Sequence, residues 1–290
     1  MFCALLSPIL FAEDEPKPDA ITALGGKVTE TKGVVTKIEF RECSKLGKAE
    51  FELIGKFTHL KNLTLYGSCK GLNDETLPLL ANLGELDELG LDGITLSDDG
   101  FKGFAALKNL RKLHLFHPSW AFKSFTGSGL AHLKELPKLE SLTFAGSTAA
   151  DAALEAIGQI TQLKDFRTWH TYQTQAGNAH LLKLVNLKEL YIGQRLPKDD
   201  KHAASFDEST IATIAQMKTL ERLTLTEARL TLKGLEPLKA LTNLKSLKIS
   251  QVDMPDDDVK KLEATFPGVK TEYKPLTDKE REELSKKLRL

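Results

Sequence analysis

Histidine is the first residue type in this sequence whose spacing could support chemistry. His114 and His117 lie three residues apart in the stretch LHLFHPSW, and His170 lies in RTWHTYQ. A zinc site needs Cys, His, Asp or Glu ligands at characteristic spacings. No cysteine or carboxylate completes such a set around these histidines. We therefore predict neither a metal nor a cofactor, and we interpret the three histidines as surface residues.

Signatures of catalysis are missing from the sequence. It contains no G-x-S-x-G elbow, no G-x-x-x-x-G-K-[ST] phosphate loop and no H-E-x-x-H helix. Acidic runs such as SDDG and PDDDV precede apolar residues, where carboxylates favour the start of a helix. We predict that the protein is not an enzyme. An unrecognised catalytic site around His114, His117, Arg167 and His170 is kept as an alternative.

Aromatic side chains gather near the same histidines, where a short polar turn would be expected. The set in chain order is Phe116, Trp120, Trp169, Tyr172 and Tyr191. Exposed aromatic residues and Arg are favoured in protein interfaces. A binding surface made of them requires a fold that brings segments about 50 residues apart side by side.

A repeat that runs through the chain supplies such a fold. In FAALKNLRKLHL, apolar residues recur every three positions from Phe104 to Leu113, and Leu115 follows two positions later. The equivalent strand residues are Ile38, Leu63, Leu89, Leu113, Leu142, Phe166, Leu190, Leu223 and Leu247. Four of the intervals between them are 24 residues, and the others are 25, 26, 29 and 33. A regular period with longer members is typical of a solenoid that carries loop insertions.

This pattern resembles the leucine-rich repeat, L-x-x-L-x-L, in its bacterial form, whose characteristic turn is matched by GITLSDDGF at 93–101. The resemblance covers about residues 34–273. It implies an α/β solenoid: a horseshoe with a parallel sheet on its concave face and short helices on its convex face. One repeat cannot bury its apolar residues alone, so stacking is what stabilises the array. Nine strands about 4.8 Å apart would form the sheet.

Segments outside the repeats predict two caps. Residues 13–33 are expected to form a linker and an N-terminal cap made of a short helix and a turn. Residues 274–290 are expected to form a charged helix, in which Thr277 and Glu280 make a capping box. This helix is either a polar cap over the last repeat or a partner-binding tail.

The N-terminal composition bears on where the protein acts. The apolar segment MFCALLSPILFA (1–12) precedes the acidic EDEPKPDA, as at the end of a secretory signal peptide. We predict export to the periplasm, cell envelope or exterior, with a mature start near Glu13; a frayed terminus of a cytoplasmic protein is the alternative. No run of 18 apolar residues predicts a membrane span. In an exported protein Cys43 and Cys69 could form a disulfide, and otherwise they are buried thiols.

Charge restricts the class of partner. Forty basic residues balance forty acidic ones, and nucleic-acid binding normally needs a basic excess. We predict a monomer that binds a protein or peptide and no nucleic acid. A structural or envelope repeat protein without a dedicated ligand is the alternative.

Alternation along a strand locates the candidate site. Residues that flank the buried leucines face the concave side, and three irregular segments that follow strands should emerge on one edge of the horseshoe. The predicted partner-binding residues are His114, Phe116, His117, Trp120, Arg167, Trp169, His170, Tyr172 and Tyr191. Trp120, together with Phe122 and Phe125, could instead fold back over a small core of its own insertion.

Overall fold

The computed structural model describes residues 15–120, 122–196, 204 and 206–289. The predicted signal segment 1–12, Cys3 and the expected mature start at Glu13 lie outside the described residues. Part of the insertion that follows Ile192 also lies outside them.

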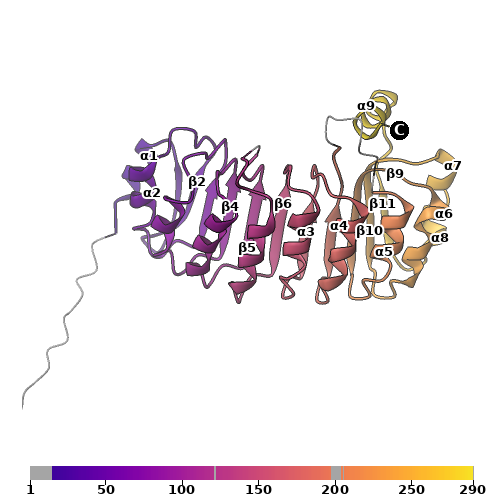
Figure 1. The fold of residues 1–290 in the computed structure, drawn as a ribbon, viewed down its shortest axis with the longest axis horizontal. Coiled ribbons are helices and arrows are strands. Elements are labelled where there is room, and N and C mark those ends of the chain that lie inside the picture. The colour runs from indigo at the N-terminus through magenta and orange to yellow at the C-terminus, as the bar shows by residue number, and fades with distance from the viewer. Residues whose placement is uncertain (1–14, 121, 197–203, 205, 290) are drawn as a thin grey trace, which may run out of the picture.

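Eleven strands form one open sheet in the order of the sequence (Figure 1). Strand β1 (Lys27–Thr31) runs antiparallel to β2 (Val34–Phe40), and every later pairing is parallel. The remaining strands are β3 (Asn62–Leu65), β4 (Glu88–Asp92), β5 (Lys112–Phe116), β6 (Ser141–Ala145), β7 (Asp165–Thr168), β8 (Glu189–Ile192), β9 (Arg222–Arg229), β10 (Ser246–Asp253) and β11 (Lys270–Tyr273). The chain is thus a leucine-rich repeat solenoid, as predicted.

Two strands were not expected. The segment predicted as a turn before the first repeat contains β1, which covers the N-terminal edge of the sheet. Strand β11 pairs with β10 so that Tyr273 lies opposite Ile249, at the usual spacing of 24 residues. It is a short further repeat whose apolar residues are too few to have been recognised.

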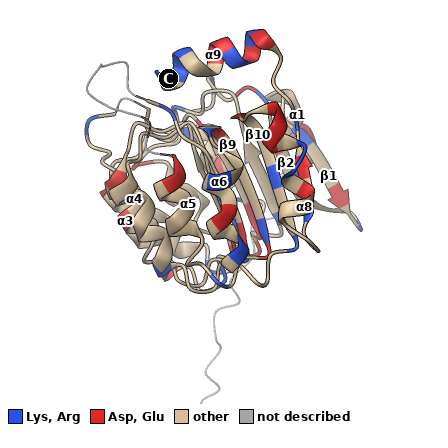
Figure 2. Ribbon diagram, turned by 90° about the vertical axis from the view of Figure 1, so that its right-hand side faces the viewer, with Lys and Arg blue, Asp and Glu red and all other residues tan. Residues whose placement is uncertain are grey.

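Short helices cover the convex face of the sheet (Figures 1 and 2). The α-helices are α1 (Pro18–Ala23), α2 (Lys48–Ile54), α3 (Asp151–Ile157), α4 (Gln175–Ala179), α5 (Glu208–Ile214), α6 (Leu232–Leu235), α7 (Asp256–Val259), α8 (Leu262–Thr265) and α9 (Asp278–Leu288). Single 3₁₀ segments are η1 (Leu77–Leu80), η2 (Asp99–Ala106), η3 (Ser128–Glu135), η4 (His180–Lys183) and η5 (Glu236–Ala240). Asp207 and Thr231 cap α5 and α6 by accepting backbone N–H groups, as their positions in the sequence indicate.

The repeated leucines form the core in register. Leu89, Leu113 and Leu142 lie directly opposite one another across β4, β5 and β6, and all three are fully buried. Two polar residues replace apolar ones in the irregular repeat after β7 and keep hydrogen bonds inside the core. Gln173 Nε2 donates to the carbonyl of Gly193 at 2.6 Å, and Asn178 Nδ2 donates to Thr210 Oγ1 at 3.1 Å.

A left-handed residue ends the L-x-L segment of most repeats, and in β9 and β10 it lies inside the strand, which continues past it. These residues are Gly67, Gly93, His117, Gly146, His170, Glu227 and Gln251, with φ between 46° and 79°. The N–H groups of Gly93, His117 and Gly146 extend the ladder; for example, His117 N–H donates to the carbonyl of Ala145 at 2.9 Å. The N–H groups of Gly67 and His170 donate instead to the carboxylates of Asp92 and Glu227. The turn therefore recurs in the same place and aims each following side chain at the same edge of the sheet.

The C-terminal helix α9 lies over the ends of β9 and β10 (Figure 2). Its first turn has the predicted capping box, in which Thr277 N–H donates to Glu280 Oε2 at 2.8 Å. Asp253 holds the helix by accepting from Arg281 at 2.6 Å and from Arg229 Nε at 2.8 Å. Leu284 and Leu288 are the buried residues of the helix.

Cys43 and Cys69 occupy equivalent positions in neighbouring repeats. Both are buried and free. A hydrogen bond with the Cys69 thiol, together with burial, raises the pKa of Cys43 above its ordinary value. Cys43 is therefore a neutral thiol at neutral pH.

Candidate functional site

Four aromatic rings form a continuous row across the concave face. Ring centroids lie 5.6 Å apart for Tyr66 and Phe116, 5.9 Å for Phe116 and Trp169, and 5.1 Å for Trp169 and Tyr191. The first two contacts are edge-on, and the third is tilted. All four side chains are partly exposed. We call these four residues the aromatic row.

Small residues between the large ones make the row continuous. Ala145 separates Phe116 from Trp169 in the register of β5, β6 and β7. Tyr66 reaches Phe116 by leaning over Gly90, where an added Cβ would lie 3.0 Å from the tyrosine oxygen. The site predicted from the sequence omitted Tyr66. Gly90, at a concave position of the next repeat, was the signal that could have included it, because it leaves room for the Tyr66 ring.

The chemistry of the row is apolar with hydroxyl and indole donors. Burial raises the pKa of the Tyr66 and Tyr191 hydroxyls above their ordinary value, so both remain protonated at neutral pH. Within the described part of the chain, no acceptor takes the Trp169 indole N–H or the Tyr66 hydroxyl proton, whereas Tyr191 hydrogen-bonds to Thr226. The row therefore has hydrogen-bond donors to offer.

A row of charged residues lies beside the aromatic row, toward the strand starts. Arg167 binds Asp165 at 3.2 Å and Glu189 at 2.7 Å, and Glu189 also binds Arg222 at 2.7 Å. His114 shares a 3.0 Å hydrogen bond with Thr143, and burial lowers its pKa. Arg167 and His114 are thus committed to neighbouring side chains.

Two histidines with left-handed backbones lie on the opposite side of the row. His117 Nδ1 is 2.8 Å from Asp92 Oδ1. His170 pairs with the largely buried Glu227 through its ring and also donates its backbone N–H to that carboxylate at 3.2 Å. His114, His117 and His170 therefore have separate partners. The described residues include no group of three or more potential ligands arranged to hold a metal.

A second aromatic group lies on the loop edge. Trp120 is 43% exposed, its ring centroid is 6.4 Å from that of Tyr172, and the Arg195 guanidinium lies 5.7 Å over it. The preceding Ser119 is buried and anchors the loop, because its hydroxyl donates to the Leu96 carbonyl at 2.6 Å. We call Trp120, Tyr172 and Arg195 the edge cluster.

The other aromatics of this insertion divide between core and surface. Phe125 is buried and stacks on Phe101 at 5.4 Å, so it closes the small core of the insertion. Phe122 remains exposed, as Trp120 does. The unusual residues after β5 thus serve two purposes: Ser119 and Phe125 hold the loop, while Trp120 faces outward.

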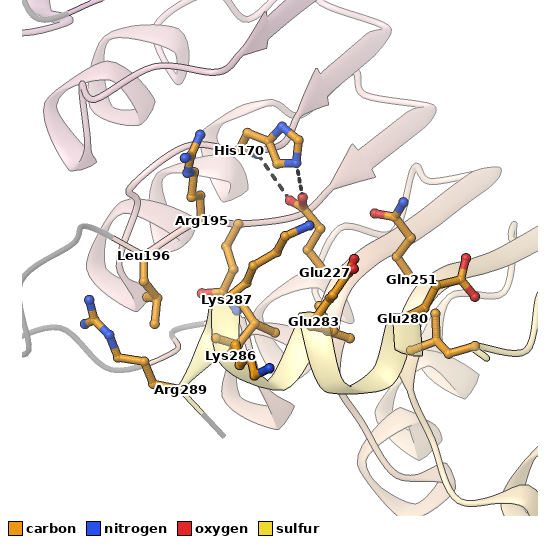
Figure 3. A pocket seen from close by; sticks show the side chains of 14 residues that line it. His170, Arg195, Leu196, Glu227, Gln251, Glu280, Glu283, Lys286, Lys287 and Arg289 are labelled. Carbon is orange, nitrogen blue, oxygen red and sulfur yellow. Dashed lines mark hydrogen bonds and ion pairs between the residues drawn. The ribbon is translucent and has the colours of Figure 1, made fainter. Parts of the chain in front are cut away.

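Beneath α9 lies a cavity of about 490 Å³ (Figure 3). Its walls include His170, Glu227 and Gln251 from the left-handed turns of the repeats and Leu284 and Lys287 from the helix. Because His170 follows Trp169 in the chain, the cavity lies close to the aromatic row. The sequence did not indicate it, since nothing in the local pattern predicts where α9 docks.

The predicted site residues fall into three groups. Phe116, Trp169 and Tyr191 join in the aromatic row; Trp120 and Tyr172 join in the edge cluster; and His114, His117, Arg167 and His170 form the polar flanks.

Comparison with known proteins adds little beyond the fold. No family model and no curated protein matches the sequence. The chain is similar to an internalin C2 of Listeria monocytogenes, with 14% identity, 79% of this chain and 84% of that chain covered, and a TM-score of 0.47. It is also similar to an internalin F of the same bacterium, with 15% identity, 84% and 87% covered, and a TM-score of 0.35. The repeat register and strand order of the chain itself define the fold.

Proposed function

We propose that this protein is a non-enzymatic recognition module that binds a protein or peptide partner. The partner would contact the concave face and the loop edge that follows the strands. The observation that carries the proposal is the aromatic row, in which four partly exposed rings contact one another on a surface that the fold leaves open.

Energetics favour such a row as a binding centre. Large aromatic side chains add much apolar contact area with few rotatable bonds, and interface hot spots are enriched in Trp, Tyr and Arg. The rings also fix one another by edge contacts, so little conformational entropy remains to be lost on binding. The edge cluster extends the same surface with a tryptophan, a tyrosine and an arginine.

The alternatives explain fewer observations. A structural repeat protein without a ligand would gain nothing from a contiguous row of exposed rings, since polar residues would keep that face more soluble. An enzyme would need a nucleophile or a pair of groups converging on a substrate. The His170–Glu227 pair does border the cavity beneath α9, but the described residues around that cavity include no Ser, Thr or Cys.

We further propose that the protein is a monomer. We also propose that it acts outside the cytoplasm, on the strength of the apolar and then acidic N-terminal segment. No described helix is long and apolar enough to cross a membrane. Sequencing the N-terminus of native protein tests export: a chain that starts near Glu13 supports it, and an intact Met1 contradicts it.

Panning a displayed random-peptide library against the protein tests the recognition function. We expect binders whose affinity falls roughly thirtyfold or more in Trp169→Ala, because truncating a hot spot costs at least about 2 kcal/mol. Trp120→Ala tests in the same way whether the edge cluster contacts the binder. The melting temperature should change little in either variant. Binders that are indifferent to both substitutions would place recognition elsewhere.

A further inference from the structure

The hydrogen-bonding state of the concave face restricts the kind of peptide that fits it. Strands β2 to β10 are each paired on both sides, so their backbone groups are already used. A bound peptide therefore cannot add a strand beneath the aromatic row. The backbone N–H and C=O groups of the peptide must then hydrogen-bond within the peptide, to side chains or to water.

Acceptors beside the row are also in use. Asp92 accepts from His117 at 2.8 Å, Glu227 accepts from His170, and Glu189 accepts from Arg167 and Arg222. The Trp169 indole N–H and the Tyr66 hydroxyl hydrogen-bond to no described residue, so both are donors that a ligand could use. The row thus presents apolar ring faces together with these two donors.

Complementarity to such a row requires a ligand that has acceptors and an apolar edge. A proline-rich segment has these properties, because proline lacks an N–H while its carbonyl still accepts, and the polyproline II helix makes no internal hydrogen bonds. Peptides of this kind dock on aromatic-lined grooves elsewhere. An α-helix satisfies its own carbonyls and would leave the two donors buried without partners.

We infer that the aromatic row binds a proline-rich segment in the polyproline II conformation, with ligand carbonyls accepting from Trp169 and Tyr66. This inference rests on the proposed function and makes it more specific. The ligand would lie across the strands, along the line from Tyr66 to Tyr191. Its apolar edge would contact the four rings, and its carbonyls would meet the two free donors.

The two tryptophans of the chain allow a direct test. In Trp120→Phe, Trp169 is the remaining tryptophan, so its fluorescence reports on the row. We expect a saturable change in emission on titration with a proline decapeptide, and none with a Gly-Ser decapeptide. Tyr66→Phe, added to that variant, keeps the ring and removes one donor. It should weaken binding about three- to tenfold, the effect of one hydrogen bond.

Phe116→Ala in the same background removes a central ring and should weaken binding more than Tyr66→Phe does. Thermal melts establish that each variant is folded. No saturable change with the proline peptide would overturn the inference, and so would an equal response to the Gly-Ser peptide or to a soluble glucan hexasaccharide. If panning then returned Trp169-dependent binders that lack proline, the recognition function would stand and the ligand class would be wrong. If it returned no Trp169-dependent binder, both would be lost.

Discussion

The left-handed turn that ends the L-x-L segment of the repeats is the feature where single residues matter most. Gly67, Gly93 and Gly146 occupy it without steric cost, whereas His117, His170, Glu227 and Gln251 hold the same conformation with a side chain. A residue other than glycine pays about 1–2 kcal/mol in this region. In this fold the strained positions carry polar side chains that border the aromatic row and the cavity beneath α9.

Substitutions at two of these turns test that cost. His117→Gly relieves the strained backbone and loses an exposed hydrogen bond with Asp92, so its unfolding free energy should stay within about 1 kcal/mol of the wild type. Gly67→Ala should lose clearly more, because an added Cβ would lie 2.3 Å from the Arg41 carbonyl oxygen. Urea denaturation measures both. Equal losses would show that the turn does not select for glycine.

His114 gives the molecule a pH dependence of known sign. Burial lowers its pKa in the folded state, with Glu88 opposing, so the unfolded chain takes up the proton first as the pH falls. Its contribution to stability is therefore complete above the unfolded pKa of about 6.5 and declines below it. Between about pH 7 and pH 5, the urea midpoint of the wild type should fall more than that of His114→Gln. His59, whose pKa is raised by Glu85, acts in the opposite direction in both proteins and cancels in the comparison.

Among the elements, strand β6 shows where the sequence pattern succeeds and where it fails. Leu142 is fully buried on the core side, as the period predicts. Thr143, expected to be exposed on the concave face, is also buried, because it hydrogen-bonds His114 and lies beside the aromatic row. A leucine period reports which face a residue takes. It does not report how far large side chains on neighbouring strands cover that face.

The same limit explains the other differences between expectation and structure. The aromatic row forms because Gly90 and Ala145 are small where Tyr66 and Trp169 on other repeats are large. The row therefore depends on residues of several repeats together. Docking of α9 depends on Asp253 meeting Arg281 across 28 residues. Local patterns predicted the helix and its capping box, but they carry no information about such long-range pairs.

Helix α9 offers a prediction at the scale of one element. Asp253 is mostly buried and joins Arg229 on β9 to Arg281 on α9. Asp253→Ala leaves both cations without their partner, so α9 should detach before the sheet unfolds, as expected for an element held by few contacts. Hydrogen exchange should speed up in 278–288 and stay slow in β5 to β7. Protection that falls equally throughout would mean that α9 is an integral part of the solenoid.

At the scale of the whole molecule, the solenoid is a row of units that contact only their neighbours. Stability is then close to a sum of repeat and interface contributions. A loss in the middle weakens two interfaces, whereas a loss near an end leaves most of the array intact. Leu142 on β6 and Leu247 on β10 occupy the same register row, and both are fully buried.

The matched pair Leu142→Ala and Leu247→Ala tests this organisation. Each truncation removes a comparable core side chain and should cost about 2–5 kcal/mol locally. Leu142→Ala should lower the midpoint of the single main transition. Leu247→Ala should instead open β9 to β11 and α9 first, so that hydrogen exchange speeds up there while β3 to β6 remain protected. Because the aromatic row spans β3 to β8, peptide binding should weaken more in Leu142→Ala than in Leu247→Ala at temperatures near the transition. Identical exchange profiles for the two variants would show that the chain unfolds as one indivisible unit, and the binding face would then depend equally on every repeat.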